Sequence, residues 1–448
     1  MLSQSPSKSG QISFFDIAQQ LNQNHPLFAL GQAFPWDELE SSFAELYSSK
    51  GRKGKPIRLM CGILILKQMY NLSDEAVIEQ WLMNPYYQVF CGETTFQTQP
   101  PCHSTELVKF RNRLGPSNIE KLFSLSVKIH GDSAEEETVI VDTTVQEKAI
   151  TYPTDTKLAI KIINRLNKLA KASGIKQRRT FIKEVKQLRI TCRYFGHKKK
   201  SGKARRALKR LRTIAGVLLR ELQRKLPIEV LDLESERFSL YERVLSQQPK
   251  DKNKIYSLHE PDVYCVGKNK ERKPYEYGSK VSVARTLESK IIVGVKNHEE
   301  NIHDSKTLES VLKSANEIRT TPIETAVVDR GYRGAKKLLP DVEIIIPGNP
   351  LKRDSEKDRK RKRRLCQKRS GIEPVIGHLK SDYRLSKNWL KGQAGDSINL
   401  LMSACAWNLK KWMALFFLLE IRGRLFIFSI MVDENRQIMT LWAHNSTK

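Results

Sequence analysis

Short runs of β-branched and aromatic residues, separated by helical segments, are the feature that most restricts the fold of this chain. The first run, "TVIVDTTVQEKAI" from Thr138, alternates apolar and polar side chains as a half-buried strand does. Later runs of the same texture are "DVYCVG", "YEYGSKVSVART", "KIIVGVKN", "ETAVVD" and "VEIIIP". Only "LES" separates the second and third of these, which favours a hairpin. The order predicts an α/β fold with a mixed sheet flanked by helices.

Helical patterns lie between and after these strands. "HDSKTLESVLKSANEIR" is expected to be a helix capped by Asp304 or Ser305. After "VEIIIP" comes a very basic stretch from Lys352 to Arg369, interpreted as a linker. "GIEPVIGHLKSDYRL" then opens a helix that carries Glu373, and "DSINLLMSACAWNLKKWMALFF" predicts a long apolar one.

The residues before Thr138 have helical periodicity. "PIRLMCGILILKQMYN" and "LSDEAVIEQWLMN" are two predicted helices, and Ser73 is the expected N-cap of the second. A third, "HSTELVKFRNRLG", is expected to start after Ser104 as cap and to stop at Gly115. Short helices with tight turns form either a helix-turn-helix DNA reader or a simple bundle, and both interpretations stay open.

The charge balance indicates a polyanionic partner. The chain holds 78 Lys and Arg against 49 Asp and Glu, a formal net charge of +29. Residues 157–225 alone hold 24 Lys and Arg and two acids, in a helical pattern that follows the first strand. A solvated helical face is the ordinary explanation of such a run, but no acidic segment balances this one, and we favour contact with DNA phosphates. The candidate contacts in its loop are Lys198, Lys199, Lys200, Arg205 and Arg206.

Other features point to a protein of a reducing compartment. The seven cysteines form no CxxC pair, which disfavours a zinc site or a disulfide framework. The first residues, "MLSQSPSKSGQ", do not resemble a signal peptide. The apolar segment from Trp412 to Ile430 contains Glu420, Arg422 and Arg424, too soon for a membrane span of about 20 apolar residues. We therefore expect a cytoplasmic protein without a membrane partner.

Three acids stand out by their position. Asp142 lies in the first strand, Asp329 ends "ETAVVD", and Glu373 follows the basic stretch. If those two strands are neighbours, both aspartates emerge together at one place in the sheet, where ligands usually bind. Three gathered carboxylates repel one another unless a divalent cation is present, which predicts Mg²⁺ or Mn²⁺. The alternative is that the aspartates are turn or cap residues and that Glu373 is merely solvated.

Charged neighbours favour the metal hypothesis. Arg369, Glu373 and Lys380 are spaced four and seven residues apart, which puts them on one helical face. Arg330 and Arg333 follow Asp329 and are expected at the rim of the site. Tyr332 is expected in the core, and Gly331 allows the chain to turn away from Asp329.

The motifs resemble those of a known family. "VDTTVQ", "SLHEPDVYCVGKNKERKPYEYGSKVSVA", "HDSKTL", "VVDRGYRG" and the long block from Arg363 to Leu409 are similar to bacterial insertion-sequence DDE transposases of the insertion-sequence-five type. The segment from Phe34 to Gly92 is similar to the helical domain that precedes the catalytic one in those proteins. The resemblance covers roughly residues 30–412.

This resemblance implies a ribonuclease-H-like catalytic core, two Mg²⁺ ions that Mn²⁺ can replace, and a DDE triad at Asp142, Asp329 and Glu373. Arg369 and Lys380 match the flanking signature, whereas Cys366 stands where that signature has a tyrosine. The implied parts are a helical DNA-binding or assembly domain over residues 1–131, a catalytic domain over 132–412 with a basic helical insertion at 156–250, and an atypical tail over 413–448.

The implied activity is cleavage at the ends of a mobile element and strand transfer into target DNA. Its partners are double-stranded DNA, as terminal inverted repeats and as target, in the bacterial cytoplasm near the nucleoid. A homodimer is expected because two element ends must be paired. The alternatives are a decayed copy that binds the element ends as a repressor, and a nuclease without a joining step. His303 and His378 are not expected to bind metal.

Overall fold

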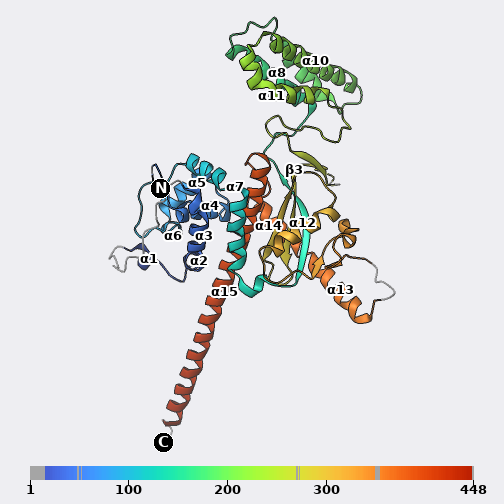
Figure 1. Cartoon of the computed structure of the whole chain (residues 1–448). Coiled ribbons are helices and arrows are strands. Elements are labelled where there is room, and N and C mark those ends of the chain that lie inside the picture. Colours follow the sequence, from blue (N-terminus) through green and yellow to red (C-terminus); the bar gives the residue numbers. More distant parts are fainter. Residues whose placement is uncertain are drawn as a thin grey trace.

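The computed structural model describes residues 16–47, 50–51, 53–268, 271, 273–348 and 354–445, with the side chains of the last helix described up to Ile421. Figure 1 shows an N-terminal group of helices, a sheet covered by helices, and a helical bundle set apart from both. The long C-terminal helix runs past the first two parts and projects beyond them.

Within the described residues, seven α-helices precede the sheet: α1 (Ile17–Gln20), α2 (Pro26–Ala33), α3 (Trp36–Phe43), α4 (Ile57–Met69), α5 (Asp74–Met83), α6 (Pro85–Phe90) and α7 (Ser104–Lys128). The helices predicted at α4 and α5 are confirmed. Ser73 caps α5 as expected, because its side chain accepts a hydrogen bond from the N–H of Ala76.

One of the two expectations at α7 is wrong. The N-cap is His103 rather than Ser104, because the His103 side chain accepts from the N–H of Thr105 and takes part in a capping box. The stop at Gly115 is confirmed in the backbone, because Gly115 has a non-helical conformation with a φ of 64°, and Pro116 begins a second helical segment directly after it. Proline is well tolerated at the first position of such a segment, where no N–H is needed.

Six strands in the described residues form one mixed sheet: β1 (Thr138–Glu147), β2 (Tyr264–Gly267), β3 (Tyr275–Thr286), β4 (Ile292–His298), β5 (Thr325–Val327) and β6 (Glu343–Ile345). β1 is central, antiparallel to β3 on one side and parallel to β5 on the other. β6 continues the parallel side, and β2 and β4 both pair antiparallel with β3. The α/β class, the predicted strands and the β3–β4 hairpin are therefore confirmed.

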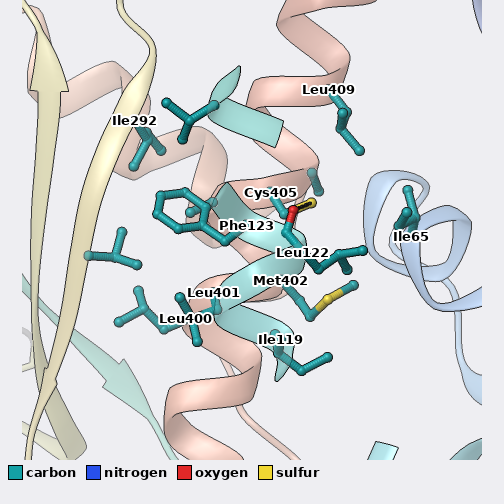
Figure 2. Close-up of a cluster of buried hydrophobic side chains, with 14 of the residues drawn as sticks. Ile65, Ile119, Leu122, Phe123, Ile292, Leu400, Leu401, Met402, Cys405 and Leu409 are labelled. Atoms are coloured by element: carbon teal, nitrogen blue, oxygen red, sulfur yellow. Dashed lines mark hydrogen bonds between the residues drawn. The ribbon is translucent and has the colours of Figure 1, made fainter. Parts of the chain in front are cut away.

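One hydrophobic core joins the N-terminal helices to the sheet. Helix α15 (Gly392–Asn445) packs against α4, α7 and β4. Figure 2 shows the side chains that meet there, contributed by α4, α7, β4 and α15: Ile65, Ile119, Leu122, Phe123, Ile292, Leu400, Leu401, Met402, Cys405 and Leu409. Burying each large apolar side chain stabilises the fold by about 1.5 to 3 kcal/mol. Helix α12 (Asp304–Asn316) covers β3 and β4.

The chain between β1 and β2 forms a separate helical insertion. Its helices are α8 (Asp155–Ala172), α9 (Ile182–Thr191), α10 (Ser201–Lys225) and α11 (Ile228–Ser246). They share a hydrophobic core of their own, in which Leu166, Leu211 and Leu218 are fully buried. The apolar residues of α10 occupy one face, which leaves its many cations on the other.

The basic stretch before Glu373 is a helix and not a linker. Of that stretch, residues 352–353 lie outside the described part, and α13 (Glu356–Arg369) occupies the rest. The Ser355 side chain caps it by accepting from the N–H of Asp358, and Lys and Arg are good helix formers once a cap is present. Helix α14 (Ile372–Ser381) follows, and α15 continues through the predicted tail to Asn445. None of the helices in the described residues is long and apolar enough to cross a membrane.

Candidate active site

The pairing of β1 with β5 brings two of the predicted acids to one place. The strands run parallel, with Ile140 opposite Val327. Continued by two residues, this register sets Asp142, inside β1, level with Asp329, just beyond the end of β5. The condition on which the sequence argument depended, a central first strand beside "ETAVVD", is met.

Asp142 is largely withdrawn from solvent. Its side chain is 19 % exposed, and its Oδ1 accepts a hydrogen bond from the N–H of Thr143 at 2.7 Å. Burial raises the pKa of Asp142 to about 6, and the negative charges of Asp329 and Asp304 raise it too, whereas the Thr143 bond and the cation of Arg369 oppose the shift. Three carboxylates therefore act on one another at this point of the sheet.

Gly331 allows two of these carboxylates to approach. Asp329 accepts a hydrogen bond on Oδ1 from the N–H of Gly331 at 2.8 Å. A Cβ at Gly331 would stand 3.0 Å from Asp329 Oδ1 and 3.1 Å from Asp304 Oδ2. Any larger residue would push against both acids. Gly331 is needed because little room is left for a side chain beside the two acids. Its backbone conformation does not require glycine, since its φ is not among the positive values.

Asp304 is the acid whose role the sequence analysis missed. It is the first residue of α12, but the N-cap is His303, whose Nδ1 accepts from the N–H of Ser305 at 3.3 Å. The expectation that Asp304 or Ser305 caps the helix is therefore wrong. The Oδ1 of Asp304 instead accepts from Thr143 Oγ1 at 3.0 Å and from Lys280 Nζ at 3.1 Å. No pattern in the sequence distinguishes it, because an aspartate at a helix start is usually a cap.

Arg369 lies between Glu373 and the first of the aspartates. Arg369 Nη1 lies 3.9 Å from Asp142 Oδ2, and its Nη2 lies 3.9 Å from Glu373 Oε1. The Glu373 side chain is 67 % exposed, on the first turn of α14. Lys380 is half-buried in the last turn of α14, about 10 Å farther along the helix axis.

A buried arginine holds the junction between α13 and α14. Arg285 of β3 is 1 % exposed, and its Nη1 donates to the carbonyls of Thr286 and Leu287 at 2.7 and 3.0 Å. Its Nη2 would stand only 2.7 Å from a Cβ at Gly371, at the start of α14. Because Gly371 has no side chain, the junction between α13 and α14 can pack against Arg285 of β3. This junction carries Arg369 and Glu373.

The other predicted DNA contacts lie at two places. Arg330 and Arg333 are exposed beside Asp329, and Arg333 lines a groove with α13 that also includes Lys336, Arg363 and Cys366. The second place is the insertion, where Lys198, Lys199, Lys200, Arg205 and Arg206 are exposed at and before the start of α10. The insertion stands apart from the sheet in Figure 1.

The two histidines have other partners. His303 caps α12, and His378 pairs through Nδ1 with Asp382 Oδ2 at 2.7 Å on exposed surface. Neither contact includes a carboxylate of the three predicted catalytic acids.

The carboxylates fit a divalent cation by chemistry and charge. Oxygen donors suit hard ions such as Mg²⁺, and burial first, then the charges of Asp329 and Asp304, raise the pKa of Asp142. The hydroxyl of Tyr332, a residue with no exposed surface, is buried nearby and has no hydrogen-bond partner in the described residues. As the side chains lie, no group of three His, Cys, Asp or Glu within the described part forms a complete metal site.

Two family models match the chain. Residues 15–113 match a model described as "Transposase domain (DUF772)", and residues 232–409 match one described as "Transposase DDE domain". The second match includes Asp329 and Glu373 and begins after Asp142, inside the insertion.

A curated relative and the solved structures complete the comparison. An uncharacterized protein of Rhizobium meliloti, ORF8 in the nfe locus, is 37 % identical over 182 residues, which cover 40 % of this chain and 88 % of that protein. No solved structure matches the chain.

Proposed function

Since the chain belongs to the bacterial insertion-sequence transposases with a DDE domain, we propose that Asp142, Asp329 and Glu373 are its catalytic triad. Enzymes with this domain cleave DNA and transfer strands. The proposed reaction is strand cleavage at the ends of the element, followed by attack of the freed 3′-hydroxyl on target DNA. The observation that carries the proposal is the parallel register of β1 and β5, which sets Asp142 level with Asp329.

DDE transposases generally use divalent metal ions. We propose two Mg²⁺ ions, replaceable by Mn²⁺, held by the three triad carboxylates. When bound, such ions would activate a water or a 3′-hydroxyl and stabilise the leaving oxygen. The rigid base for this chemistry is the central strand β1, which is paired on both sides.

Arg369 has a separate task in this proposal. Its guanidinium lies between Asp142 and Glu373, at 3.9 Å from each. There it limits their mutual repulsion and offers donors to the phosphate of a bound strand. Arg330 and Arg333 would contact the same strand at the rim, and Lys380 a more distant phosphate.

The ribonuclease-H-like assignment of the catalytic core is also part of the proposal. Its support is a sheet in which antiparallel β2, β3 and β4 lie on one side of a central β1, and parallel β5 and β6 lie on the other. The DNA bound would be the terminal inverted repeats and the target. The N-terminal helices and the insertion would hold it, and a homodimer would pair the two ends.

The test is DNA cleavage by the purified protein. Wild type, Asp329→Asn and the exposed control Asp341→Asn are incubated with Mg²⁺ and a labelled duplex from the DNA that flanks this gene. Wild type and the control should nick at the element end and slowly form joined products. Asp329→Asn should cut at least about a hundredfold more slowly than wild type. That decrease corresponds to a loss of about 2.7 kcal/mol or more in transition-state stabilisation.

Two results would contradict the proposal. If all three proteins bound the duplex and none cut it, the repressor alternative would hold. If wild type gave hydrolysis products but never joined strands, the protein would be a nuclease.

A further inference from the structure

The two carboxylate oxygens of Asp304 have different surroundings: Oδ1 accepts hydrogen bonds, and Oδ2 lies near Gly331 in the candidate active site. Oδ1 accepts from Thr143 Oγ1 and Lys280 Nζ. Oδ2 has no donor among the described residues, and it lies 3.1 Å from the place where a Gly331 Cβ would be, beside Asp329 Oδ1 at 3.0 Å from that same place. Both oxygens therefore approach Gly331, and the negative charge of Asp304 also acts on Asp142.

The tie is rigid. The side chain of Lys280, on β3, is only 11 % exposed, and its Nζ also donates to the carbonyl of Ile302 at 2.8 Å. Thr143 directly follows Asp142 on β1. The position of Asp304 is thus set by the two central strands, and one of them carries the first predicted catalytic acid.

Helix capping and ion pairing do not account for this arrangement. An acid in the first turn of a helix contributes about 0.3 to 1 kcal/mol, and a partner such as Lys280 satisfies one oxygen. Both roles would be served equally well with Oδ2 turned to solvent. The charges of Asp304 and Asp329 both act on Asp142, and carboxylates gathered in this way repel one another unless a cation lies among them.

Tyr332 gives an independent indication. The residue has no exposed surface, and its hydroxyl makes no hydrogen bond of ordinary geometry in the described residues, although the Thr307 side chain is near enough to act on it. The negative charges of Asp142, Asp304 and Asp329 all act on this hydroxyl. A buried hydroxyl near three carboxylates that makes no ordinary hydrogen bond is a feature that a bound ion or water explains.

We propose that Asp304 is a fourth carboxylate of the metal centre, which offers Oδ2 to a divalent cation shared with Asp142 and Asp329. Lys280 and Thr143 hold its other oxygen. The inference rests on the proposed function, since it adds a ligand to the centre proposed there. It also assigns the centre three aspartates from the sheet and α12, with Glu373 approaching from the exposed side.

The test measures binding of Mn²⁺ to the full chain without DNA, from the electron paramagnetic resonance signal of the free ion. Asp304→Asn should raise the Kd for Mn²⁺ about tenfold or more, as loss of a supporting or ligating group does at metal sites. Asp304→Glu keeps the charge for Lys280 but moves the carboxylate by one methylene, so it should also weaken binding. Glu309→Gln, on the exposed face of the same helix, should bind as wild type does.

The outcomes separate this inference from the proposed function. If Asp329→Asn lost Mn²⁺ affinity while Asp304→Asn and Asp304→Glu kept it, the metal centre would stand and Asp304 would be only a structural partner of Lys280. If wild type bound no Mn²⁺, the proposed centre and the inference would both be wrong. If Asp304→Asn failed to fold, as judged by circular dichroism, Asp304→Glu alone decides.

Discussion

The buried hydroxyl of Tyr332 affects the stability of the site that holds the aspartates. Burial, together with the negative charges of Asp142, Asp304 and Asp329, raises the pKa of Tyr332 well above its ordinary value. The phenol therefore stays protonated and can donate a hydrogen bond, but no described residue accepts it. A buried hydroxyl in this state opposes folding.

Removing that hydroxyl should therefore not destabilise the protein. We expect Tyr332→Phe to leave the free energy of unfolding unchanged or to raise it by about 1 kcal/mol. Tyr264→Phe is the matched contrast, because the Tyr264 hydroxyl donates to the carbonyl of His298 at 2.8 Å and accepts from the N–H of Lys280. Its loss should lower the free energy by about 1 to 2 kcal/mol. Urea denaturation of both variants measures the difference, and equal destabilisation would contradict the account of Tyr332.

At this scale the sequence predicts acids on strands better than acids on helices. Asp142 and Asp329 could be singled out because a carboxylate inside or just after a buried strand has no ordinary reason to be there. Asp304 could not, since an aspartate at a helix start is usually a cap, and only the three-dimensional contact with Thr143 and Lys280 shows otherwise. The reason for Gly331 likewise appears only when Asp304 lies beside it.

Among the elements, α7, α15 and β4 meet at a small polar cluster. Asn408 of α15 is fully buried and bonds the backbone of Ile292 on β4 through both its amide atoms. The Nε2–H of His130, just past α7, donates to the carbonyl of Asn408 at 3.0 Å. Burial lowers the pKa of His130 to about 4, and the cation of Lys411 adds to this, against the effect of that hydrogen bond.

This histidine should make stability fall with acid. In the unfolded chain a histidine titrates near 6.5, whereas folded His130 stays neutral to about pH 4. The unfolded state therefore takes up a proton first, and the folded state loses stability as pH falls from 6.5 to 4. His130→Gln should lose less in melting temperature between pH 7 and pH 5 than wild type does. An unchanged pH dependence in His130→Gln would show that the imidazole is not responsible.

Among the elements, helix α13 is the one that the local sequence pattern did not predict. Its composition is so basic that the stretch resembles a solvated linker, and only Leu365 is buried on it. The cap at Ser355 and ion pairs such as Arg361 with Glu343 of β6 turn it into a helix docked on the sheet. Strands and apolar helices, which bury a whole face, could be predicted from periodicity.

Over the whole molecule, much of the excess positive charge lies on the insertion, apart from the proposed chemistry. The insertion has its own hydrophobic core, so its cations can be arranged on the outside without disturbing the sheet. Figure 1 shows that this bundle is set apart from the strands. The arrangement fits a surface that holds DNA phosphates while the sheet holds the reacting one.

Neutralising part of that surface should change the salt dependence of DNA binding. For Arg205→Gln with Arg206→Gln, the slope of log Kd against log salt should fall by about 0.9 for each lost phosphate contact. Cleavage at saturating protein should remain. The same change at Lys296 of β4 and Lys313 of α12, both exposed and outside the two parts proposed to hold DNA, is the control for net charge, and an equal effect there would argue against a specific role for the insertion. Fluorescence anisotropy at several salt concentrations gives the slopes.

The sequence also predicts the mixed sheet and the place of the insertion, but not the shared core. Helix α4 is buried on nearly all sides, yet its sequence does not show that some of its partners lie more than three hundred residues away. Gln68 of α4, for example, donates to the carbonyl of Tyr383 at 2.8 Å and to Ser403 Oγ at 3.0 Å. Contacts of that range depend on the complete fold.

The parallel pairing of β1 with β5 has a consequence for the order of synthesis. The insertion and the β3–β4 hairpin are complete before Thr325 emerges, and at 5 to 20 residues per second the delay after β1 is about ten seconds or more. During that time the basic bundle can fold on its own core, whereas Asp142 still lacks its neighbour. A chain that stops before Thr325 therefore keeps the cationic surface but never assembles the pair of aspartates.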